Sequence, residues 1–150
     1  MLNVIGLGNF LKGDDAIGLL IIEKLSKLFD KSQLNLVDAG ADAISLLDYL
    51  IGNDPVLIID CAKMGKKPGD VLAFDVNEVN IAKIYNTLSL HGFRFGDVYE
   101  MAKKIGRVAP CKIIGVEPKH INFNEELSSE VEASIPKIIN IVKMEAQNDA

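Results

Sequence analysis

The feature that most constrains this fold is a series of short apolar runs separated by segments with helical spacing. Four runs of four to six residues are typical of strands buried on both faces of a sheet: residues 2–7, 34–37, 55–59 and 112–116. A buried helix would need a longer run, so the shortness of these runs favours strands. Their alternation with helical segments predicts an α/β protein whose sheet is largely parallel.

The helical segments each place their apolar residues on one face. They are residues 14–28, 43–50, 95–105 and 135–142. Gly106 directly follows the third segment and is a suitable C-terminal stop. We expect the chain to fray after the last helix, so that residues 145–150 form a loose tail.

The loop at residues 61–69 is too short for a crossover helix, so the strand expected at residues 70–74 runs antiparallel to the one before it. About five strands should therefore form a mixed, mostly parallel sheet with helices on both faces. Neither a repeat nor a low-complexity tract divides the sequence, and we expect residues 1–150 to form a single domain.

Length and hydropathy exclude some classes of protein. With 150 residues, 49% of them hydrophobic, the chain can bury roughly 70% of its unfolded surface and should fold without disulfides or metals. The longest apolar stretch, residues 16–22, is about a third of a membrane span, and no basic residue precedes Lys12. We therefore expect neither a membrane span nor a secretory signal.

Charge and cysteine content indicate which kinds of partner and which cellular compartment to expect. A net charge of −5, with only two arginines among sixteen basic residues, argues against nucleic acid as a partner. Cys61 and Cys111 are far apart in apolar surroundings, which is typical of neither a zinc site nor a disulfide framework. These observations favour a cytoplasmic protein.

Aspartates lie where the expected strands end, at the edge where α/β sheets bind ligands. Asp14 and Asp15 follow the first strand, Asp38 ends the second, and Asp60 ends the third. Asp14 and Asp15 have a structural explanation, because carboxylates at a helix start accept exposed N–H groups and complement the helix dipole. Asp60 follows so apolar a strand that its charge needs a hydrogen bond, an ion pair or a metal, and structural and functional roles are equally supported.

Imidazole chemistry depends on His91 or His120, the only two histidines. His91 precedes a helix and either projects into the crevice or is simply exposed, whereas His120 has no recognisable partner in the sequence. Two carboxylates and one imidazole would suit nickel, zinc, manganese or cadmium. Sequence spacing alone does not define such a site.

The glycine-rich turn at residues 6–11 begins like a dinucleotide-binding fingerprint, but Leu11 stands where the third glycine belongs. Asp14 and Asp15 then follow where phosphate would bind, which argues against NAD. The sequence also contains no Gly-x-Ser-x-Gly motif, so a serine nucleophile has no support.

An ordered set of motifs runs from residue 2 to about residue 118. They are Gly6-Leu7-Gly8-Asn9, Gly13-Asp14-Asp15-Ala16-Ile17-Gly18, Asp38-Ala39-Gly40, Leu57-Ile58-Ile59-Asp60, Gly65-Lys66-Lys67-Pro68-Gly69 and Ser89-Leu90-His91. No single motif is specific, but the set closely resembles the nickel-iron hydrogenase maturation endopeptidases. The resemblance implies a three-layer α/β/α sandwich that removes a short C-terminal peptide from the hydrogenase large-subunit precursor once nickel has been inserted.

The resemblance also implies roles for individual residues. The family's three metal-contacting positions correspond to Asp15, Asp60 and His91, which would also be the catalytic residues. Asp38 and Gly40 fall in a loop expected to recognise the substrate. No resident cofactor is implied, since the substrate supplies the nickel, although cadmium or zinc could occupy the site artificially. We expect a monomer.

The sequence departs from the family pattern in three places. Asp14 beside Asp15 leaves open which of the two is the metal contact. Residues 38–41 lack the second glycine of the family's Asp-Gly-Gly-Thr segment, which would alter the loop that recognises the substrate. Cys61 replaces the usual alanine, either as a metal contact or as a small buried apolar residue.

Two other functions fit parts of the pattern. A non-catalytic chaperone that senses nickel in the large subunit would need the same three ligands. A peptidyl-tRNA hydrolase shares the Gly-Leu-Gly-Asn turn, but that family's Pro-Gly and Arg-His-Asn motifs are absent. A pI near 5.0 also disfavours an RNA substrate.

We expect the loops at residues 38–43, 61–69 and 90–94 to contact the substrate. Within the last region, the spacing of Phe95 to Val98 and Ala102 predicts that Phe95 packs inward. Phe93 would then face solvent, the substrate or the core.

Overall fold

The computed structural model describes residues 1–76 and 95–149. Five strands form one sheet in the order β2-β1-β3-β5-β4. Their bounds are β1 Asn3–Leu7, β2 Asn35–Gly40, β3 Val56–Cys61, β4 Val71–Asp75 and β5 Cys111–Val116. β1, β2, β3 and β5 run parallel, and β4 pairs with β5 in the antiparallel direction. The predicted mixed, mostly parallel sheet is thus confirmed, including the reversed strand.

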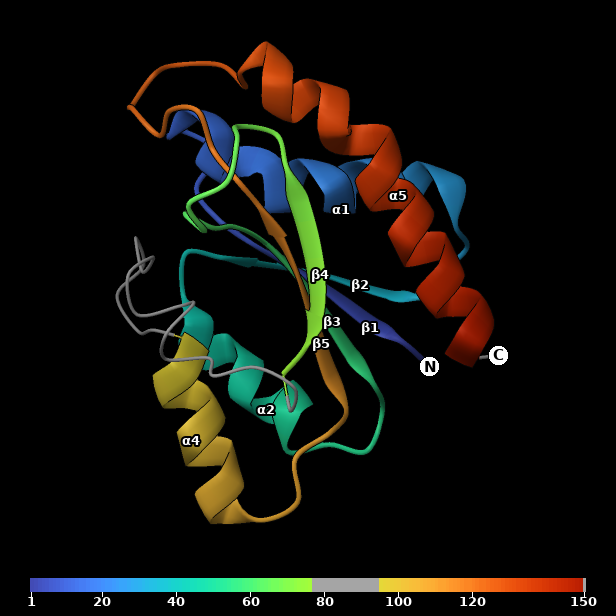
Figure 1. The fold of residues 1–150 in the computed structure, drawn as a ribbon. Helices are drawn as coiled ribbons and strands as arrows, with labels where there is room; N and C mark the ends of the chain where they lie inside the picture. Colours follow the sequence, from blue (N-terminus) through green and yellow to red (C-terminus); the bar gives the residue numbers. More distant parts are fainter. Residues whose placement is uncertain (77–94, 150) are drawn as a thin grey trace.

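Helices cover both faces of the sheet, as Figure 1 shows. α1 (Ile17–Leu28) and α5 (Ser129–Asp149) lie on one face, and α2 (Leu47–Leu50) and α4 (Phe95–Ile105) lie on the other. Short 3-10 helices, η1 (Gly13–Ala16) and η2 (Ala43–Leu46), lead into α1 and α2. The protein is therefore the three-layer α/β/α sandwich that the sequence predicts.

Alternate residues of the central strands supply the two cores. In β1, Ile5 and Leu7 pack with α2 and α4, whereas Val4 packs with α1 and α5. β3 does the same, with Ile58 in the first core and Leu57 in the second. Because successive side chains point to opposite faces, strands covered on both sides must be apolar throughout. This explains the short unbroken apolar runs of the sequence.

Two glycines let α1 lie unusually close to the sheet. A Cβ atom at Gly18 would overlap the carbonyl oxygens of Leu7 and Ile59, and one at Gly6 would lie 2.5 Å from the Gly18 carbonyl oxygen. Only hydrogen atoms fit at these two positions. The first turn of α1 is consequently seated across β1 and β3, and η1, which precedes it, is placed at the carboxyl ends of both strands.

The C-terminal helix is longer than the sequence suggests. We expected the chain to fray from Glu145, but α5 continues to Asp149. Two contacts explain the difference: Ala146 packs against the α1–α5 core, and Oε1 of Glu145 lies 2.9 Å from Nζ of Lys112. No helix within residues 1–76 and 95–149 has the length and hydropathy needed to cross a membrane.

We predict that Gly18→Ala destabilises the protein by about 1–3 kcal/mol, because a methyl group there must displace two backbone carbonyls. Gly106→Ala is the matched control, since a Cβ at Gly106 meets nothing within 4 Å. Urea unfolding of both variants tests this prediction. A Gly18→Ala protein as stable as the control would show that the close helix–sheet approach is not required.

Candidate active site

Two buried carboxylates lie at the carboxyl edge of the sheet. Asp60 is near the end of β3, beside Gly115 of β5, and is 2% exposed. Asp15 is in η1, which follows β1 after a turn at residues 8–12, and is fully buried. The connections from β1 and from its neighbour β3 diverge at this edge, which is the position where open α/β sheets bind ligands. The structure thus places two of the predicted site residues at the expected edge.

The negative charges at this edge affect the pKa of the Cys61 thiol. Burial raises its pKa well above the ordinary value, and the carboxylates of Asp60 and Asp15 are the next largest causes, followed by Asp14 and Glu117. Each negative neighbour disfavours the thiolate. Cys61 therefore stays a neutral thiol, as the interpretation of a small buried apolar residue expects.

The turn that carries Asp15 is held against the end of β1. Gly8 has φ 146°, and a Cβ there would overlap the Asp15 carbonyl oxygen. That carbonyl oxygen accepts a hydrogen bond from the N–H of Asn9 (3.2 Å), and the N–H of Asp15 donates to the carbonyl of Lys12 (3.0 Å). A side chain at Gly8 would push Asp15 away, so the second glycine of the Gly-Leu-Gly-Asn motif fixes the position of the carboxylate.

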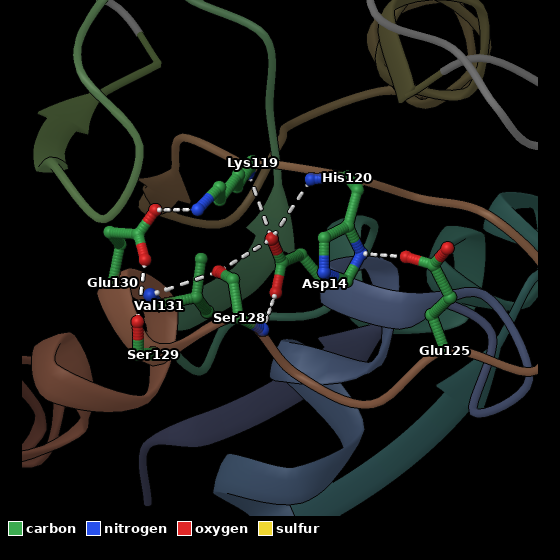
Figure 2. A network of polar contacts seen from close by, with 8 residues as sticks. All are labelled: Asp14, Lys119, His120, Glu125, Ser128, Ser129, Glu130 and Val131. Carbon is green, nitrogen blue, oxygen red and sulfur yellow. Dashed lines mark hydrogen bonds and ion pairs between the residues drawn. The ribbon is translucent and has the colours of Figure 1, made fainter.

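Asp14 has a different role from Asp15, although the two are adjacent. Its Oδ2 accepts hydrogen bonds from the N–H groups of Lys119 (2.8 Å) and His120 (3.2 Å) and from the Ser128 hydroxyl (2.8 Å). Its Oδ1 accepts from the Ser128 N–H (2.7 Å). Figure 2 shows these donors converging on the carboxylate. Asp14 therefore fastens η1 to the segment between β5 and α5, and its oxygens are occupied.

Ser128 connects this network to the start of α5. Its hydroxyl oxygen accepts a hydrogen bond from the N–H of Val131 (3.3 Å), which is the geometry of a helix N-cap. The same hydroxyl donates to Asp14. Sequence reasoning identified Asp14 as a possible cap but missed Ser128, because the two residues are 114 positions apart.

His120 also has a partner that the sequence did not reveal. Its Nδ1 lies 3.0 Å from Oε2 of Glu125, and its carbonyl oxygen accepts a hydrogen bond from the Asp14 N–H (2.9 Å). The first contact lies within the segment that Asp14 fastens (Figure 2), and the second joins that segment to η1. His120 is accordingly a structural residue of that segment.

Glu117 is a further buried carboxylate that sequence reasoning missed. It follows β5, is 6% exposed, and its Oε1 accepts hydrogen bonds from the N–H groups of Met64 (2.6 Å) and Lys66 (2.9 Å). These bonds tie the 61–69 loop to the end of β5. The sequence did hold an indication, since a glutamate directly after a buried strand needs hydrogen-bond donors for its carboxylate. It does not show which residues supply those donors.

Asp38 and Gly40 end β2 at the same edge. Oδ1 of the exposed Asp38 accepts a hydrogen bond from the Gly40 N–H (2.9 Å), and Gly40 has φ 58°. The Gly40 carbonyl oxygen then accepts from the N–H of Gly8 (2.8 Å). This hydrogen bond connects the 38–43 loop to the turn that carries Asp15.

His91 and Phe93 lie outside the described residues, as does the whole of the 90–94 loop. In the part of the chain that is described, no group of three or more His, Cys, Asp and Glu side chains is arranged to hold a metal ion. Phe95 is 1% exposed and stacks on Tyr99, which confirms that it packs inward.

The sequence matches the model of a known family. The hydrogenase maturation protease family, HycI, matches residues 19–145. A protein of Methanocaldococcus jannaschii named as a hydrogenase maturation protease is 34% identical over 146 residues, covering 91% of this chain and 83% of that protein. The hydrogenase expression/formation protein HupD of Rhizobium leguminosarum bv. viciae is 25% identical over 139 residues, covering 91% and 69%.

Solved structures share the fold. The hydrogenase maturating endopeptidase HybD of Escherichia coli gives a TM-score of 0.81 at 23% identity, over 98% of this chain and 92% of that chain. An endopeptidase of Escherichia coli gives a TM-score of 0.82 at 25% identity, over 94% and 88%. The chain therefore belongs to the hydrogenase maturation protease family. It is a peptide hydrolase of hydrogenase maturation, which confirms the prediction made from the ordered motifs.

We predict that Asp14→Asn destabilises the protein by about 2–4 kcal/mol, because one acceptor oxygen becomes an N–H₂ group that faces N–H donors in a buried site. Asp38→Asn is the control: this side chain is exposed and accepts a hydrogen bond from the Gly40 N–H, so the substitution should cost less than about 1 kcal/mol. Denaturant unfolding measures both. Equal stability of the two variants would contradict the anchoring role of Asp14.

Proposed function

We propose that this protein removes a short C-terminal peptide from the nickel-loaded precursor of a hydrogenase large subunit, and that Asp15, Asp60 and His91 contact the nickel carried by that precursor. The observation that carries the proposal is the pair of buried carboxylates at one edge of the sheet in a chain of this family. Of the two adjacent aspartates, we assign the nickel contact to Asp15, because the oxygens of Asp14 are occupied by four hydrogen bonds.

The donor types suit a metal that is already held by another protein. Two carboxylates and one imidazole are borderline-hard ligands that nickel accepts, and three ligands leave coordination positions open for the precursor's own groups. The nickel is thus part of the substrate, and the protein itself has no resident cofactor. Zinc or cadmium would be an artificial occupant.

Peptide hydrolysis requires an activated water and a stabilised oxyanion. We assign Asp60 or Asp15 to position the water and accept its proton as oxygen adds to the scissile carbonyl carbon. The substrate's nickel would act as a Lewis acid on the carbonyl or on the water; the C–N bond then breaks, and the proton passes to the leaving amine. Burial keeps bulk water from competing with the charged groups at this edge.

Recognition, assembly and compartment complete the proposal. We assign contact with the precursor to Asp38 and Gly40, whose loop is hydrogen-bonded to the Asp15 turn through Gly8. The protein acts as a monomer in the cytoplasm. A nickel-sensing chaperone would use the same ligands, but membership of a protease family supports cleavage.

We predict that Asp15→Ala, Asp60→Ala and His91→Ala each lower the rate of processing of the nickel-loaded precursor by at least about a hundredfold, because each removes a group that contacts the reacting centre. Asp48→Ala, at an exposed aspartate of α2, is the control and should process normally. Gel analysis of precursor cleavage gives the rates, and thermal unfolding checks the fold. Folded Asp60→Ala protein with full activity would contradict the assignment.

We predict that exchanging residues 38–43 for the corresponding loop of a relative that processes a different hydrogenase shifts precursor preference toward that hydrogenase. Exchange of residues 30–34, between α1 and β2 at the opposite edge, is the control. Competition between the two precursors measures the preference. An unchanged preference after the first exchange would place recognition elsewhere.

A further inference from the structure

Three large apolar side chains beside the Asp15 turn are exposed to solvent. Phe10 is 50% exposed, Leu11 61% and Phe123 62%. They come from two segments, the turn after β1 and the segment before α5. A contiguous exposed apolar patch is uncommon in a single chain and usually marks a binding surface.

These side chains are presented by a hydrogen-bonded frame. The N–H of Asn124 donates to the Leu11 carbonyl (2.9 Å), and the Leu11 N–H donates to Oδ1 of Asn9 (2.9 Å). Nζ of Lys12 lies 5.0 Å from the centre of the Phe123 ring. Asn124 has φ 63°, a left-handed conformation that L residues seldom adopt. The patch is therefore built in place, which lowers the entropy lost when a partner binds.

A groove of about 370 Å³ adjoins this patch and carries negative charge. Phe10, Leu20 and Leu127 supply its apolar lining, and Glu125, Glu126 and Glu132 supply carboxylates. Glu125 faces His120 (Figure 2), whereas within the described residues the carboxylates of Glu126 and Glu132 make no hydrogen bond or ion pair. The groove is complementary to a segment with apolar and basic side chains.

The groove shares a wall with the candidate active site. Gly13 and Ala16 line it, and these two residues flank Asp14 and Asp15 in η1. A segment bound in the groove would therefore pass within one helical turn of Asp15.

We propose that this surface, Phe10, Leu11 and Phe123 with the adjoining groove, docks an apolar segment of the hydrogenase precursor that carries lysine or arginine. The inference rests on the proposed function and adds the partner chemistry of a second contact beside the cleavage site. A second copy of this chain is a poorer occupant, because it has net charge −5 and a twofold contact would bring the same glutamates together.

Kinetics of precursor cleavage test the apolar part of the surface. Phe10→Ser/Phe123→Ser should raise KM at least about tenfold and leave kcat within about twofold, since the surface binds the precursor without touching the reacting atoms. Leu28→Ser/Met144→Ser is the control, because both side chains are 55% exposed and lie in α1 and α5, outside the surface. Control-like KM values for the first variant would overturn the proposal.

Charge reversal tests the groove. Glu126→Lys/Glu132→Lys should raise KM and flatten its dependence on salt, whereas Glu23→Lys, at an exposed glutamate of α1, should do neither. Unchanged KM and salt dependence would overturn the basic character of the partner segment.

Wild-type protein that leaves the nickel-loaded precursor uncut would refute the proposed function itself. Normal wild-type cleavage with unaffected variants would refute only the docking surface.

Discussion

The close approach of α1 to β1 and β3 sets the position of the candidate site. Gly18 rests against the carbonyls of Leu7 and Ile59, and the helix can begin there only because no side chain intervenes. Its position determines where η1 lies, and η1 carries Asp15 to the edge where Asp60 lies near the end of β3. A packing contact between backbone atoms thus brings together two carboxylates that are far apart in the sequence.

The adjacent residues Asp14 and Asp15 have different roles at that edge in the proposed function. Asp14 accepts hydrogen bonds from three residues between β5 and α5, so the turn cannot rotate without breaking a buried charged network. This anchoring restrains the turn that carries Asp15, as the proposed role of Asp15 at the nickel requires. In the proposed function, Asp14 serves stability and the neighbouring Asp15 serves the chemistry.

Much of the fold was predictable because burial on both faces imposes a simple pattern. The apolar run ending in Asp60 identified β3, and the short 61–69 loop correctly implied that β4 is antiparallel. The prediction of a frayed C-terminal tail was wrong, because the end of α5 is stabilised by the contact of Glu145 with Lys112 and by packing against the core between α1 and α5. The partners of Asp14, Glu117 and His120 could not be predicted, since such contacts depend on how distant loops meet in space.

In the proposed function, cleavage requires the nickel that the precursor holds. Its most direct test is to incubate the wild-type protein with the same large-subunit precursor prepared with and without nickel, and to measure the release of the C-terminal peptide. We expect rapid release from the nickel-loaded precursor and essentially none from the nickel-free form. Equal release from both forms would contradict it.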